Sequence, residues 1–114
     1  MKPIAAMIAV LMIVGAPAVF AHPAEEIELA FDTKTQTLVA KIFHQVPDPK
    51  AHYIRTITVM LNGEEVANET LTEQTDGLFE QYNLPFEAVN SGDEITLKAE
   101  CSLGGTKEAS FKVA

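Results

Sequence analysis

Three histidines and one cysteine are the residues of this chain most suited to chemistry. His44 and His52 lie on either side of the segment 45–51, in which two prolines stiffen the backbone. Imidazole is the commonest metal ligand in proteins, and such ligands must be held by rigid elements. The spacing therefore predicts either a pair of metal ligands or two ordinary loop histidines.

Cys101 and His22 are the other two candidates. Cys101 ends a segment of strict apolar–polar alternation on its apolar side, so it is either a small buried hydrophobic residue or a thiolate ligand. His22 becomes the first residue if the chain is cleaved after Ala21. Its α-amine and ring nitrogen could then chelate one metal ion, and copper(II) favours such nitrogen sets. The alternative is that His22 belongs to a frayed terminus.

The N-terminal segment predicts export. Residues 1–21 carry a single charge at Lys2, followed by an apolar run and then by Gly15 and Pro17. Small residues precede the expected cleavage site after Ala21, which is the layout of a secretory signal peptide rather than of a membrane anchor. We therefore expect a periplasmic or secreted protein of residues 22–114 that meets a membrane only through its signal peptide.

The elements that must position the candidate residues are strands. Apolar residues of the mature chain alternate with a period of two, and no segment shows a convincing amphipathic helix. Asn62-Gly63 is a strong hairpin signal. We expect about seven strands, at about 26–32, 37–44, 53–61, 64–70, 78–84, 94–101 and 107–113. Short strands separated by regular turns predict a single all-β domain, an immunoglobulin-like β-sandwich.

Composition excludes several classes of function. The chain has 114 residues with 16 acidic and 8 basic side chains, so its formal charge of −8 would repel a nucleic acid. A single cysteine cannot form an internal disulfide or a four-thiolate metal site. No phosphate-binding loop, nucleotide fingerprint or Ser-His-Asp set is present.

Two segments together resemble the iron-binding domain of the desulfoferrodoxin and superoxide reductase family. They are residues 43–66, FHQVPDPKAHYIRTITVMLNGEEV, and residues 92–105, GDEITLKAECSLGG. The resemblance implies an immunoglobulin-like sandwich with ferrous iron at one end, held by four histidine nitrogens and one axial cysteine thiolate. In the family, superoxide binds at the open sixth position and is reduced to peroxide. Carried over to this chain, His44 and His52 match two loop histidines and Cys101 matches the axial thiolate.

The chain departs from the family pattern at two ligands. Gly104 stands where the family has a histidine after the cysteine, and residues 33–42 contain no upstream histidine. The segment between His44 and His52 is also longer than in the family. The resemblance thus implies a partial iron site, in which His22 is a candidate substitute ligand. It leaves superoxide reductase activity open, and copper or zinc also suits imidazole and thiolate ligands.

Three functions remain open from the sequence. The first is an exported metal-binding protein with a redox role, using His44, His52 and Cys101. The second is a periplasmic accessory module with a vestigial, metal-free site, which presents its loops or an edge strand to a redox or accessory protein partner. The third is copper binding through a mature N-terminal His22. Metal analysis of the exported protein would separate the second from the other two.

Overall fold

The computed structural model describes residues 22–114, and the predicted signal peptide lies outside the described residues. The described part contains seven strands, which confirms the predicted all-β class, and each boundary lies within one residue of its prediction. Their bounds are β1 Glu26–Asp32, β2 Thr37–Phe43, β3 Ile54–Leu61, β4 Glu64–Thr70, β5 Phe79–Pro85, β6 Glu94–Cys101 and β7 Thr106–Lys112. Within residues 22–114 there is no helix of the length and apolarity that crossing a membrane requires.

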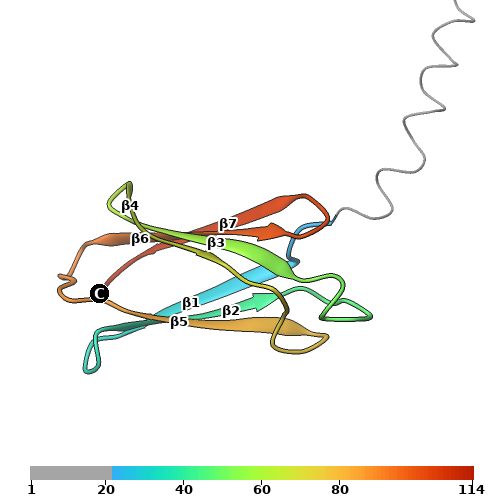
Figure 1. The fold of residues 1–114 in the computed structure, drawn as a ribbon. Helices are drawn as coiled ribbons and strands as arrows, with labels where there is room; N and C mark the ends of the chain where they lie inside the picture. The colour runs from blue at the N-terminus through green and yellow to red at the C-terminus, as the bar shows by residue number, and fades with distance from the viewer. Residues whose placement is uncertain (1–21) are drawn as a thin grey trace, which may run out of the picture.

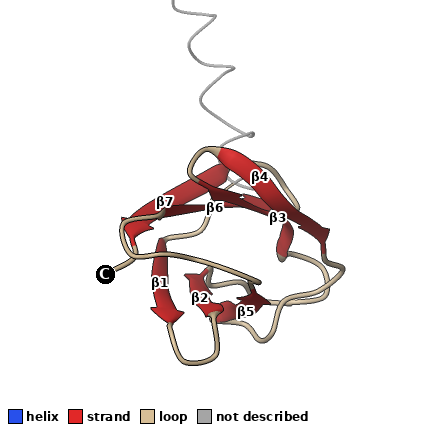
Figure 2. Cartoon of the chain, turned by 90° about the vertical axis from the view of Figure 1, so that its left-hand side faces the viewer, coloured by secondary structure: helices blue, strands red, loops and turns tan. Residues whose placement is uncertain are grey.

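The strands form two antiparallel sheets that face each other. One sheet has the order β1-β2-β5 and the other the order β4-β3-β6-β7 (Figure 1). The two layers are seen end-on in Figure 2. The chain changes sheet between β2 and β3, between β4 and β5, and between β5 and β6. This division into three and four strands agrees with the predicted immunoglobulin-like sandwich.

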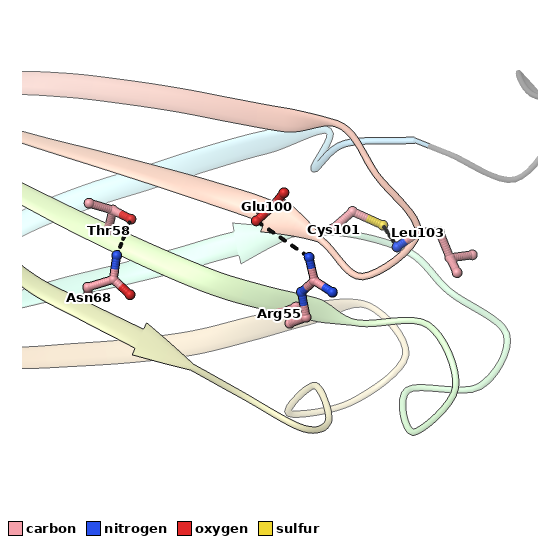
Figure 3. Close-up of polar contacts among 6 residues, drawn as sticks. All are labelled: Arg55, Thr58, Asn68, Glu100, Cys101 and Leu103. Atoms are coloured by element: carbon pink, nitrogen blue, oxygen red, sulfur yellow. Dashed lines mark hydrogen bonds and ion pairs between the residues drawn. The ribbon is translucent and has the colours of Figure 1, made fainter.

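Alternation along each inner strand builds the core. In β6 every second side chain is buried, and its neighbours point outward. The fully buried apolar residues come from both sheets and include Leu38, Ala40, Ile42, Ile57, Val59, Ile95, Leu97 and Ala99. Cys101 is the last member of the inward row of β6 and is itself fully buried. The neighbouring Glu100 points outward and pairs with Arg55 of β3 at 3.8 Å (Figure 3).

The connections gather at two opposite ends of the sandwich (Figure 1). We call one the turn end, formed by residues 33–36, 62–63 and 86–93. We call the other the loop end, formed by residues 22–25, 44–53, 71–78 and 102–105. At the turn end, Asn62 and Gly63 have φ angles of 53° and 85°, which is the conformation that the predicted Asn-Gly hairpin requires. All four candidate residues lie at or border the loop end.

Candidate metal centre

Three imidazole rings meet at the loop end. Potential ligand atoms of His22, His44 and His52 all lie within 4.8 Å of one another. Ring centroids are 4.8 Å apart for His22 and His44, 4.6 Å for His22 and His52, and 4.9 Å for His44 and His52. Nitrogen donors on one metal ion stand about 3 to 3.5 Å apart, given bonds of about 2.1 Å. Movements of about an ångström or less would therefore bring all three rings onto one ion.

The strands account for the position of two of these rings. His44 follows β2 directly, and His52 lies shortly before β3 begins. Between them the chain folds back on itself, because the backbone N–H groups of Ala51 and His52 donate to the Asp48 carbonyl at 3.0 and 2.9 Å. The buried Val46 anchors the segment through its N–H bond to the Gly77 carbonyl at 2.8 Å. The segment 45–51 is thus tied to the neighbouring segment 71–78.

Residues 22–25 at the loop end position the third ring, which is that of His22. The His22 carbonyl oxygen lies 3.2 Å from Nε2 of His44. The next residue, Pro23, rests against the β6–β7 turn, where a Cβ placed on Gly105 would come within 3.1 Å of the Pro23 nitrogen and Cδ. Gly105 also has a φ of 92°, which favours glycine. This close approach lets the segment carry His22 onto the other two histidines.

Cys101 adjoins the cluster through His52. Its Sγ lies 3.1 Å from Nε2 of His52. The backbone N–H of Leu103 also donates to this sulfur at 3.4 Å (Figure 3). Cysteine binds metal ions through its sulfur, so Cys101 is a potential fourth donor beside the three histidines. The structure therefore places all four predicted site residues together, with the three histidines in one group and Cys101 beside one of them.

Sequence reasoning missed one residue of this region, Gln74. Its side chain is 3 % exposed, and its Oε1 lies 2.8 Å from Nδ1 of His44. Gln74 belongs to the polar connection between β4 and β5, where a single glutamine carries no motif or periodicity. Its partners are far away in the sequence, so only the folded chain reveals the contact.

The surroundings of His52 favour its neutral imidazole form. Burial lowers the pKa of His52 below its ordinary value, and the neighbouring His44 and His22 lower it further by charge repulsion. A neutral ring keeps the lone pair that a metal ion needs. Three imidazoles and a thiol are a donor set suited to iron, copper or zinc, so the residues present fit a transition-metal ion.

Comparisons with known proteins concern the fold alone. No family model matches the chain, and no curated protein is significantly similar to it. Among solved structures, the chain is similar to a superoxide reductase (neelaredoxin) from Ignicoccus hospitalis. The two share 15 % sequence identity with a TM-score of 0.49, and the match covers 83 % of this chain and 81 % of that chain.

Proposed function

We propose that this domain binds one transition-metal ion at its loop end, through His22, His44 and His52 with Cys101 as a fourth donor. The observation that carries the proposal is the convergence of three histidine donors within 4.8 Å of one another. The sequence resemblance favours iron(II), and copper and zinc are the competing ions. Export to the periplasm or the exterior, and a redox role served by a protein partner, belong to the same proposal.

The donor types and the burial of these four residues determine which chemistry the proposed site could support. Iron held by imidazole and thiolate ligands supplies one-electron redox chemistry. His44 is fully buried, which keeps one ring in a fixed environment, whereas His22 and His52 are half-buried. Four protein donors leave room for an external molecule on an ion that accepts five or six ligands.

Metal analysis tests the proposal directly. The protein is exported from its own signal, purified, stripped of metal and titrated anaerobically with Fe²⁺, Cu²⁺ or Zn²⁺. We expect close to one ion per chain, and loss of that ion in His44→Ala and His52→Ala. The matched control is the double variant Glu64→Gln and Glu65→Gln, which removes two exposed carboxylates of β4. Equal metal loss in the control, or no stoichiometric metal in the wild type, would overturn the proposal.

A second measurement tests the thiolate. Co²⁺ bound by a thiolate gives an intense ligand-to-metal charge-transfer absorption that imidazole ligands alone do not give. We expect this band in the wild type and its loss in Cys101→Ser, with Co²⁺ still retained by the three histidines. A band that persists in Cys101→Ser would remove Cys101 from the ligand set.

Copper binding through a mature N-terminus is the second candidate. It is favoured by the position of His22 in the same group as His44 and His52. Mass spectrometry of the exported protein reports whether residue 22 is the first. A form that retains Ala21 keeps the His22 ring and moves the free α-amine away, so a specific loss of Cu²⁺ affinity in that form supports amine ligation. Equal Cu²⁺ affinity in the two forms would refute it.

A further inference from the structure

The buried side-chain amide of Gln74 makes hydrogen bonds that permit only one placement of its oxygen and nitrogen atoms. Its Nε2 group donates to two backbone carbonyls, those of His44 at 2.7 Å and Asp76 at 3.0 Å. Its Oε1 accepts the backbone N–H of Ile54 at 3.2 Å. A carbonyl can only accept and a backbone N–H can only donate, so the reverse orientation would set like groups against each other at all three contacts.

This orientation determines which nitrogen of His44 carries a proton. Oε1 of Gln74 also lies 2.8 Å from Nδ1 of His44, and since Oε1 is an acceptor, Nδ1 must donate. In the neutral ring the other nitrogen, Nε2, then holds the lone pair. Nε2 is the atom on the side of His22, 3.2 Å from its carbonyl oxygen. That carbonyl alone would favour a proton on Nε2. The contacts of His44 with Gln74 and with His22 therefore favour opposite tautomers of the ring.

We infer that Gln74 is a positioning residue, whose buried amide holds His44 in the Nδ1–H tautomer and thereby assigns Nε2 as the metal-binding atom. The inference rests on the proposed metal site for its second half, and on the hydrogen-bond network alone for its first. Gln74 acts like the outer partner of many metal-bound histidines, which accepts the second ring N–H and fixes the ring's orientation. Here the partner is a neutral amide, and it also joins three segments of backbone at the loop end.

Nitrogen NMR of the metal-free protein tests the first half. Long-range ¹H–¹⁵N correlations distinguish the two tautomers, and His44→Ala assigns the signals of His44. At a pH above about 8, where histidine is ordinarily neutral, we expect a protonated Nδ1 and an unprotonated Nε2. A protonated Nε2 at His44 would overturn the inference. No metal is needed, so failure of the proposed function would not obscure this result.

A variant pair tests the second half. In Gln74→Met we expect the His44 tautomer to change and metal affinity to fall about 10- to 100-fold. The matched control is Gln36→Met, since Gln36 bridges Thr33 and Val89 by similar amide bonds at the turn end. We expect the control to keep the wild-type tautomer and affinity. Wild-type affinity and tautomer in Gln74→Met would refute the inference, and if that variant fails to fold, the wild-type NMR measurement decides.

Discussion

The turn end and the loop end of the sandwich are stabilised in different ways. At the turn end the Asp32 carboxylate accepts the N–H groups of Lys34 and Thr35, two and three residues away, and these bonds are exposed. At the loop end the side-chain contacts of His44 and His52 are buried or half-buried and span long stretches of sequence. His44 bonds Gln74 across 30 residues, and His52 contacts Cys101 across 49. Local sequence thus shapes the turn at residues 33–36, whereas the histidine contacts at the loop end depend on the completed fold.

Metal-induced stabilisation should give the largest difference between the two ends. A ligand that binds only the folded protein at 100 times its dissociation constant adds about 2.7 kcal/mol of stability. We expect Zn²⁺ to raise the melting temperature of the wild type and of Asn62→Ala, which alters the turn end. The rise should disappear in His52→Ala. Calorimetry with and without Zn²⁺ measures it, and an equal rise in all three proteins would break the comparison.

Two glycines sharpen the comparison because they share a backbone conformation at opposite ends. Gly63 and Gly105 have φ angles of 85° and 92°. Alanine at either site should cost about 1 to 2 kcal/mol of unfolding free energy, measured in urea, because an L-residue is strained there. A Cβ at Gly63 meets no atom within 4 Å, whereas one at Gly105 meets Pro23 at 3.1 Å. Only Gly105→Ala should therefore weaken metal binding, and weakening in Gly63→Ala would contradict this reasoning.

Tyr82 in the core differs from Gln74, whose amide oxygen and nitrogen both have hydrogen-bond partners. Its buried hydroxyl has no hydrogen-bond partner among the described residues, and burial raises its pKa to about 12. Because an unpaired buried hydroxyl is unfavourable, Tyr82→Phe should leave the free energy of unfolding unchanged or raise it by about 1 kcal/mol. Chemical denaturation measures the change. A clear loss of stability would mean that the hydroxyl has a partner in solution.

The smallest expected effect is a pH dependence at Glu80, on the β5 side of the loop end. Burial raises the pKa of this carboxyl above its usual 4.5. The folded state then holds the proton more tightly than the unfolded state, so this contribution to stability is present below pH 4.5 and is lost as pH rises through the folded pKa. Glu80→Gln keeps an acceptor for the Thr75 N–H, bonded at 2.8 Å.

The variant should therefore gain stability relative to the wild type as the pH is raised from acid to neutral. Melting temperatures of both proteins across that range provide the measurement. A difference that stays constant with pH would show that Glu80 has the same pKa in both states.

The strands could be predicted from the sequence, whereas the site could be predicted only in part. A period of two depends only on neighbouring residues, which is why the predicted strand boundaries and the buried position of Cys101 agree with the structure. The prolines between His44 and His52 predicted a stiff loop, and the structure shows this segment hydrogen-bonded to residues 71–78. Gln74 could not be found in this way, because its role is created by a ring 30 residues away. His22 was a candidate through an expected cleavage and as a substitute ligand, and no sequence pattern placed it near His44 and His52. In the structure its ring lies in the cluster, and Pro23 packs against Gly105.

The wide spacing of the four donors along the chain has a consequence for folding kinetics. His22 precedes β1 and Cys101 ends β6, so the complete set exists only after both sheets have paired and closed. Contacts formed after the rate-limiting step change the unfolding rate and leave the folding rate nearly constant. If the site forms after the rate-limiting step, a metal ion bound there would slow unfolding of the domain and leave its folding rate nearly unchanged.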